Sequence, residues 1–319
     1  MQTHPAFVTA CGTHAATASS HRLFSCSHTK LPTRAAKSHK SRAPAIQMTQ
    51  SASLDERDRE ITVDGAKIVY DYFQGDRTHP VVVYLPGFFY ARSRLAKINA
   101  LQMFCKRKRQ GLLTLDYFGT GRSEGDFNTG TVSRWLTDTL AALDKELKGR
   151  KVVLVGSGIG GWIMLHVAMR RPEMVVGLVG LSADPDFTEE LLVPVLTEEM
   201  KQTLEMEGVV QLKWGFRKYP ISKALIDDGK KMRVLTGGKD SLSILCPVRL
   251  IQGMNDEEIP KEYALRLVEC IRSEDVIVTF VKYGDHTLET DEDFVRMWEA
   301  VSEVSDKYFE FDLTSPSSG

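Results

Sequence analysis

Short apolar runs alternate with longer amphipathic stretches along residues 55–319. The apolar runs are rich in β-branched residues and predict strands. They lie at residues 61–63, 68–73, 81–85, 112–116, 152–155, 175–181, 248–251 and 276–281. The amphipathic stretches predict helices at residues 94–107, 132–147, 161–171, 261–270 and 292–308. One helical face is clearest in the second stretch, where apolar residues recur at spacings of three and four: Val132, Leu136, Leu140, Leu143 and Leu147.

This alternation predicts an α/β fold in which a mostly parallel sheet is covered by helices on both faces. Several of the strands are uninterrupted apolar runs, which is the pattern of strands buried on both sides. The Asp64-Gly65 pair between the first two runs predicts an antiparallel hairpin at one edge of the sheet.

Residues 184–243 interrupt the alternation. They carry mixed helical patterns of Glu, Leu and Lys and show no clear strand. An insertion of this size predicts a small helical cap over one end of the sheet, where ligands of such sheets bind. Its apolar residues are candidates for lining an acyl groove, with plain core packing as the alternative: Phe187, Leu191, Leu192, Val195, Trp214 and Phe216.

The first 54 residues differ in composition from the rest of the chain. They contain six Lys and Arg residues, many Ser and Thr, and no Asp or Glu. This composition is typical of an organelle transit peptide, with a merely disordered basic arm as the alternative. We expect import into the mitochondrial matrix; a chloroplast is the alternative, because the first basic residue is Arg22. Without this segment the formal net charge falls from −1 to −7.

Charge, hydropathy and cysteine content exclude several classes of function. The overall net charge is near zero and therefore does not indicate nucleic-acid binding. No apolar run approaches the roughly 18 residues that a membrane-spanning helix needs. The five cysteines are too scattered for a disulfide framework, and no C-x-x-C spacing indicates zinc. We therefore expect one globular domain over residues 55–314, free thiols, no metal or cofactor, and a disordered tail at 315–319.

Two loops follow early strands and carry weak signals. In Leu85-Pro86-Gly87-Phe88 a strand stops abruptly, so the Phe88 amide could point into a pocket as an oxyanion donor. The loop from Asp116 to Ser123 is rich in glycine. A tight turn that needs positive φ explains it as well as any function does.

Three later features occur in an order that chance rarely produces. The turn Gly156-Ser157-Gly158-Ile159-Gly160 matches the small-x-nucleophile-x-small elbow between a strand and a helix. Asp256 then follows one strand, and His286 follows the last one. Elbow, acid and histidine in this order predict the frame of a hydrolytic triad.

At these residues the chain resembles the α/β-hydrolase superfamily over nearly all of residues 60–310. Within it, the chain is similar to the mitochondrial palmitoyl-protein thioesterase and acyl-glucuronide esterase branch. The similarity rests on Phe104-Cys105, the Asp116–Ser123 loop, residues 160–166, residues 171–173 and residues 246–250. The resemblance implies hydrolysis of an acylated protein or a small acyl ester or thioester. It also implies an oxyanion hole from the Phe88 and Ile159 amides, with His286 as base and Asp256 orienting it.

The elbow departs from this family at its central position, which is Gly158 here. Ser157 lies one place early, and successive side chains of an elbow point in different directions, so we do not expect it to attack. Loss of the serine predicts weak or absent covalent catalysis, whereas Gly158 relieves backbone strain at the turn. Two alternatives remain: a water activated by His286 in place of the hydroxyl, or a pseudoenzyme that keeps the pocket for binding an acyl group or a partner.

A dinucleotide-binding protein is a more remote interpretation of the same turn. Gly156-x-Gly158-x-x-Gly161 follows a strand, and Asp184 follows the next strand as a candidate ribose ligand. However, this unit lies behind two earlier strand-helix units, and the interpretation leaves Asp256, His286 and the cap unexplained.

Overall fold

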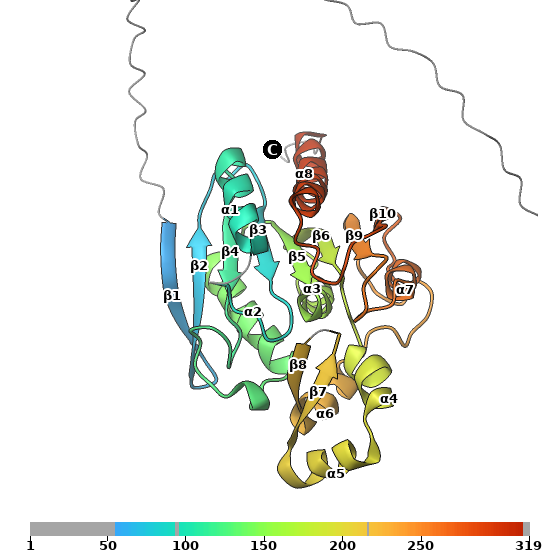
Figure 1. Ribbon diagram of the computed structural model, residues 1–319. Helices are drawn as coiled ribbons and strands as arrows, with labels where there is room; N and C mark the ends of the chain where they lie inside the picture. Colours follow the sequence, from blue (N-terminus) through green and yellow to red (C-terminus); the bar gives the residue numbers. More distant parts are fainter. Residues whose placement is uncertain (1–54, 93–95, 216, 315–319) are drawn as a thin grey trace, which may run out of the picture. The chain divides into compact units, whose positions relative to one another are not determined.

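The computed structural model describes residues 55–314, apart from 93–95 and 216. The predicted transit peptide and the predicted disordered tail lie outside the described residues. The centre is an eight-stranded sheet in the order β1-β2-β4-β3-β5-β6-β9-β10 (Figure 1). Its strands are β1 (Asp55–Val63), β2 (Ala66–Phe73), β3 (Val81–Leu85), β4 (Leu112–Leu115), β5 (Val152–Ser157), β6 (Val175–Leu181), β9 (Val248–Gly253) and β10 (Val276–Val281).

The strand directions confirm a mostly parallel sheet with an antiparallel edge. β1 and β2 form the predicted hairpin, and β2 pairs antiparallel with β4. The pairs from β4 through β3, β5, β6 and β9 to β10 are all parallel. The carboxyl ends of these six strands therefore meet at one edge of the sheet.

Helices cover both faces of the sheet because the strand side chains alternate between two buried clusters. In β3, Val81, Val83 and Leu85 belong to the cluster that contains residues of α2, α3 and α7. Val82 and Tyr84 belong to the cluster that contains residues of α1 and α8. These helices are α1 (Ala96–Lys108), α2 (Val132–Glu146), α3 (Ile159–Arg170), α7 (Glu262–Cys270) and α8 (Asp291–Thr314), each close to a predicted range.

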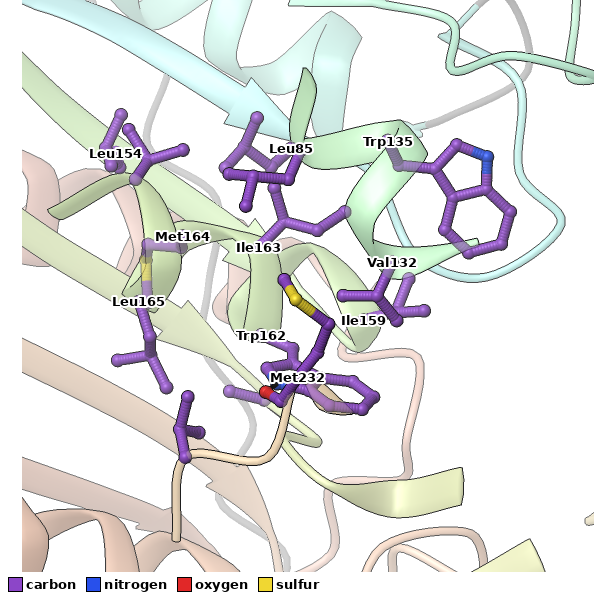
Figure 2. Close-up of a cluster of buried hydrophobic side chains, with 14 of the residues drawn as sticks. Leu85, Val132, Trp135, Leu154, Ile159, Trp162, Ile163, Met164, Leu165 and Met232 are labelled. Atoms are coloured by element: carbon purple, nitrogen blue, oxygen red, sulfur yellow. Dashed lines mark hydrogen bonds between the residues drawn. The ribbon is translucent and has the colours of Figure 1, made fainter. Parts of the chain in front are cut away.

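Helix α3 is buried on every side. Residues Ile159 to Ala168 are all buried, since the helix packs against both the sheet and the segment between β6 and β9. Trp162, which lies next to Met232 in Figure 2, donates from Nε1 to the Met232 carbonyl at 3.0 Å. His166 Nε2 donates to the same oxygen at 2.9 Å. These two hydrogen bonds attach the inserted segment to the helix that starts at the elbow.

The segment of residues 184–243, called the cap below, contains a β-hairpin as well as helices. The expectation that it has no strand is wrong: β7 (Val209–Trp214) pairs antiparallel with β8 (Arg217–Ser222). The buried Val210 and Leu212 alternate with the exposed Gln211 and Lys213, which is the period-two pattern of a strand. Figure 1 shows the cap gathered beyond one end of the sheet. Its remaining elements are a π-helical turn (Thr188–Leu192), α4 (Val193–Val195), α5 (Glu198–Glu207) and α6 (Lys223–Lys231).

Candidate active site

The turn between β5 and α3 consists of a single residue, Gly158. Its φ of +53° and ψ of −126° are rarely adopted by residues with a side chain. The Gly158 amide donates to the Leu181 carbonyl of β6 at 3.1 Å, and its own carbonyl accepts from Gly161 at 2.8 Å. The turn thus has the geometry of a nucleophile elbow, with Gly158 at its central position.

The neighbouring glycines fix this register. A β-carbon on Gly156 would stand 2.5 Å from the Gly160 carbonyl oxygen, and one on Gly160 would stand 2.1 Å from the Leu85 carbonyl oxygen. Neither position tolerates a side chain. At Gly158, by contrast, the nearest atom to an added β-carbon is Oδ2 of Asp184, 3.5 Å away. The site therefore has room for the side chain that the chain lacks.

Asp256 and His286 come together beside this turn, from the loops after β9 and β10. His286 Nδ1 donates to Asp256 Oδ2 at 3.0 Å. The other oxygen of Asp256 accepts from the backbone amides of Glu258 (2.9 Å) and Ile259 (2.8 Å), which holds the carboxylate in place. His286 Nε2 lies 3.8 Å from the point at which a β-carbon on Gly158 would stand. A histidine and a carboxylate that orients its ring are thus arranged around the elbow at Gly158.

Two further acids, Glu258 and Asp184, lie beside the elbow and His286. Neither was expected from the sequence to take part in hydrolysis. Glu258 Oε2 lies 3.6 Å from His286 Nε2, and burial raises the pKa of Glu258. Asp184 lies next to Gly158, and burial together with the charges of Glu258 and Asp256 raises its pKa well above the usual value. The sequence signal for both was their position in the loops that follow two strands of the parallel region, β6 and β9.

Ser157 lines the same cleft, one residue before the centre of the elbow. It continues the face of β5 on which Val153 and Val155 pack into the cluster with α1 and α8. Burial raises the pKa of Tyr84 on β3, and a hydrogen bond with Ser157 opposes that rise. Among the described residues, the side-chain polar partners of His286 are Asp256 and Glu258, not Ser157.

A cleft with about 640 Å³ of open space lies between the elbow and the cap. Gly158, Glu258 and His286 line it from the sheet side. Of the predicted groove residues, Phe187, Leu192 and Trp214 line it, Leu191 and Val195 do not, and Phe216 lies outside the described residues. The missed hairpin contributes Tyr219 and Ile221, so the wall of the cleft is largely apolar and aromatic.

The loop after β3 is anchored by the ring of Phe88. Its centroid lies 5.1 Å from that of Phe127, 6.0 Å from those of Trp135 and Phe187, and 5.7 Å from that of Tyr219. The ring therefore joins the sheet domain to the cap at the cleft. The Cα of Gly87 lies 3.7 Å from the β-carbon position of Gly158, so this loop runs beside the elbow.

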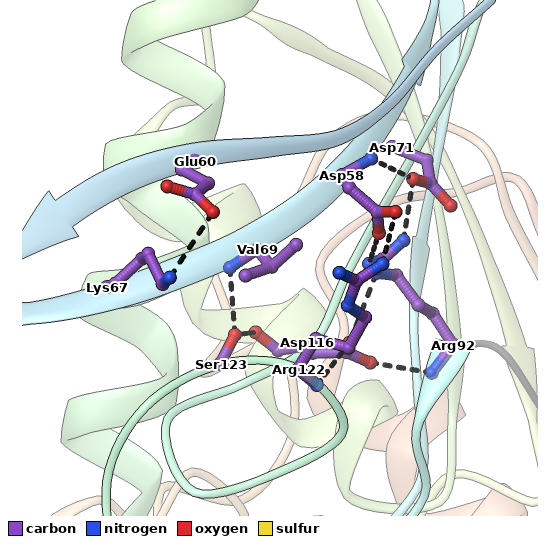
Figure 3. Close-up of polar contacts among 9 residues, drawn as sticks. All are labelled: Asp58, Glu60, Lys67, Val69, Asp71, Arg92, Asp116, Arg122 and Ser123. Atoms are coloured by element: carbon purple, nitrogen blue, oxygen red, sulfur yellow. Dashed lines mark hydrogen bonds and ion pairs between the residues drawn. The ribbon is translucent and has the colours of Figure 1, made fainter.

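The Gly-rich loop after β4 has a structural role. Asp116 accepts the backbone amides of Arg92 at 2.7 Å and Arg122 at 3.0 Å, and its carbonyl accepts the Ser123 hydroxyl at 2.7 Å (Figure 3). The Arg92 guanidinium also pairs with Asp116, Asp71 and Asp58. This buried network ties the loops after β3 and β4 to the edge hairpin.

The described part of the chain offers no group of three His, Cys, Asp or Glu residues that could hold a metal ion. Cys105, Cys246 and Cys270 are free thiols. Between residues 55 and 314, leaving out the few that are not described, no helix is long and apolar enough to cross a membrane.

An elbow at the end of a central parallel strand, with an acid and a histidine on later loops, is the arrangement of the α/β-hydrolases. The chain belongs to this family: the Alpha/beta hydrolase family pattern matches residues 82–296. The strand order also differs from that of the dinucleotide-binding fold, and Asp184 faces Gly158 in the cleft. Both observations argue against the dinucleotide interpretation.

Within the α/β-hydrolase family, the chain is similar to several particular proteins. The chain is 33% identical over 233 residues to the protein named "Palmitoyl-protein thioesterase ABHD10, mitochondrial" from Mus musculus, covering 72% of this chain and 76% of the relative. The solved structure of alpha/beta hydrolase domain-containing protein 10 from mouse superimposes with a TM-score of 0.70 at 29% identity, covering 78% of this chain and 98% of that one. A putative hydrolase from Agrobacterium vitis S4 gives a TM-score of 0.73 at 32% identity, covering 77% and 98%.

Proposed function

We propose that this protein binds acyl thioesters or acyl esters in the cleft at Gly158, and that hydrolysis is weak or absent because the serine nucleophile is missing. The observation that carries the proposal is the Asp256–His286 pair, joined at 3.0 Å and facing the elbow. A histidine oriented in this way by a carboxylate is the base of serine-type acyl transfer.

The walls of the cleft support an acyl ligand. Phe187, Leu192, Trp214 and Ile221 offer an apolar surface, which suits the hydrocarbon chain of a fatty acyl group. The Phe88 and Ile159 amides are our candidates for the oxyanion hole. Ile159 is the first residue of α3, and the first amides of a helix have no partner within the helix.

The relatives support the substrate class and the compartment. Those with about 30% identity carry the name palmitoyl-protein thioesterase and the word mitochondrial. We therefore propose an acylated protein or a small acyl ester or thioester as substrate. The acid-free first 54 residues support import into mitochondria, with the matrix as the expected compartment.

The absence of a serine at position 158 determines how far turnover is expected to fall. Removing the serine of a triad lowers turnover by about 10⁶, and roughly 10³–10⁴ over water remains from the oxyanion hole and binding. We do not propose Ser157 as its replacement, since among the described residues the side-chain partners of His286 are Asp256 and Glu258.

The test compares the full chain with Gly158→Ser and Gly158→Ala on a medium-chain acyl thioester. The serine variant should turn over at least about 10³-fold faster than the parent and react covalently with a fluorophosphonate, because His286 already faces the position. The alanine variant has the same backbone demand without a hydroxyl and should do neither. Equal rates for parent and serine variant would contradict the proposal.

A pseudoenzyme is the second candidate, favoured by the same combination of a retained cleft and an absent nucleophile. A non-hydrolysable acyl thioether analogue separates the two. Binding to the parent without any turnover of the thioester supports a binding protein, and binding with slow turnover supports a weak hydrolase.

A further inference from the structure

Resting on the proposed function, we propose that Asp184 positions a hydrolytic water in the space of the missing serine side chain. The protein then hydrolyses its acyl substrate by direct attack of water, with His286 as base and without a covalent acyl-enzyme. Asp184 is a positioning residue in this scheme, and Gly158 is what leaves room for the water.

The location of Asp184 is the first observation. It lies three residues beyond the end of β6, and its amide donates to the Gly158 carbonyl at 3.4 Å. The residue is 6% exposed and nevertheless lines the cleft. Oδ1 of its carboxyl group is buried without a hydrogen-bond partner among the described residues. A buried carboxyl with an unpaired oxygen is costly, and such groups call for a functional explanation.

The direction of the carboxyl group is the second observation. Oδ2 of Asp184 lies 3.5 Å from the β-carbon position of Gly158, and His286 Nε2 lies 3.8 Å from the same point. Two polar groups from different loops thus converge on a space that only a glycine leaves open. A water close to this point lies within hydrogen-bonding reach of both groups after a small displacement.

The protonation states of the surrounding groups fit these two roles. Burial and the charges of Glu258 and Asp256 raise the pKa of Asp184, which favours its uncharged form. An uncharged carboxyl has one donor and further acceptor sites, so it can hold a water without competing for its proton. His286 donates from Nδ1 to Asp256, so Nε2 carries no proton in this tautomer and can accept one from the water, beside Glu258 Oε2 at 3.6 Å.

The reaction balances with water as the only co-reactant. The water oxygen bonds to the acyl carbonyl carbon while its proton passes to Nε2 of His286. The tetrahedral oxyanion would accept hydrogen bonds from the Phe88 and Ile159 amides. The bond from carbon to the sulfur or oxygen of the leaving group then breaks, and His286 returns the proton to that atom. The products are the free fatty acid and a thiol or an alcohol.

The experiment measures kcat and KM for a medium-chain acyl thioester with the full chain. The variants are Gly158→Ala, Asp184→Ala, Asp184→Asn and His286→Ala, with the exposed Glu207→Gln as the matched surface control. Parent turnover should exceed that of His286→Ala. Gly158→Ala, which fills the water position, and Asp184→Ala should each lower kcat by about 10-fold or more with KM little changed, since positioning is lost. Asp184→Asn should recover part of the rate, because an amide still donates and accepts.

Two readouts identify the route. The parent should remain unlabelled by a fluorophosphonate during turnover, and Asp184→Ala should cost a smaller factor in a Gly158→Ser background, where the hydroxyl attacks. Gly158→Ala or Asp184→Ala proteins that melt like the parent and keep its kcat would overturn the proposal. Binding of the thioether analogue without turnover above His286→Ala would overturn this inference but not the proposed binding function. Failure of the analogue to bind would overturn the proposed function itself.

Discussion

His286 Nε2 lies 3.8 Å from the point at which a β-carbon on Gly158 would stand. The histidine that we propose as base and the elbow are therefore in register, although the elbow carries no side chain. This register is held by the backbone, because Gly156 and Gly160 admit no β-carbon and α3 starts directly after the turn. The molecule combines the α/β-hydrolase fold with a glycine at the centre of the elbow.

We expect Gly158→Ser to raise turnover and to lower stability. The φ of +53° and ψ of −126° cost about 1–3 kcal/mol for a residue with a side chain. The cleft itself offers room, since the nearest atom to the new β-carbon is 3.5 Å away. Urea unfolding should show a similar loss for Gly158→Ser and Gly158→Ala. A clear loss in only one of them would mean that something other than backbone strain decides the cost.

Gly160→Ala should be far more damaging than a glycine replacement in open space. Its β-carbon would stand 2.1 Å from the Leu85 carbonyl oxygen, so strand β3 or helix α3 has to move. We expect a loss of several kcal/mol, about what the worst core overpacking costs. Gly149→Ala is the control: it has a φ of +75° and nothing within 4 Å, so only about 1 kcal/mol of backbone strain applies. Equal losses in thermal unfolding would contradict this argument.

In the Gly158→Ser background, Asp256→Asn should lower kcat by about 10⁴ while the fold persists. An amide at this position can donate to His286 Nδ1, which favours the ring tautomer whose Nε2 carries the proton and cannot act as base. Its side-chain oxygen can still accept the Glu258 and Ile259 amides that now bond to Oδ1. Steady-state kinetics together with a melting curve test this. A kcat within tenfold of the serine variant would show that Asp256 does not set the tautomer.

The stability of the protein should depend on pH through Asp184. Its folded pKa is raised, so its contribution is fully present below the unfolded pKa of about 4 and is lost as the pH rises through the folded pKa. Asp184→Asn removes this loss. The unfolding free energy of the variant, relative to that of the parent, should therefore increase from about pH 5 to about pH 8. Urea unfolding at both ends measures the gain, with Glu207→Gln as surface control. A gain that shrinks with rising pH would reverse the sign argued here.

Arg92→Met should destabilise the protein by about 3–5 kcal/mol, because it leaves buried acids without their counter-charge. The Arg92 side chain is 4% exposed and pairs with Asp71 at 2.6 Å and with Asp116 at 3.1 Å. Arg171→Met breaks the more exposed pair with Asp144 and should cost about 0–1 kcal/mol. Chemical denaturation of both variants compares them directly. Similar small losses would show that the network in Figure 3 contributes little to stability.

The strands of the central sheet were predictable from local sequence patterns, whereas the strands of the cap were not. β3, β6 and β10 match the predicted ranges residue for residue, because each is a run rich in β-branched and other apolar residues; β3 and β6 are also buried, whereas β10 is an edge strand. The β7–β8 hairpin was missed because polar residues interrupt the apolar ones in both strands and Pro220 disfavours a strand. A proline is tolerated there since a two-stranded sheet consists only of edges. Tyr219 and Ile221 were therefore not expected in the cleft.

The sequence by itself determined the order of the elements, the elbow with glycine at its centre, and the acid and histidine that follow later strands. Each of these depends on local periodicity or on a motif a few residues long. Only the tertiary structure decided that Asp184 and Glu258 face the elbow beside His286. Such relations join loops far apart in the chain, and they arise because parallel strands bring their carboxyl ends to one edge of the sheet.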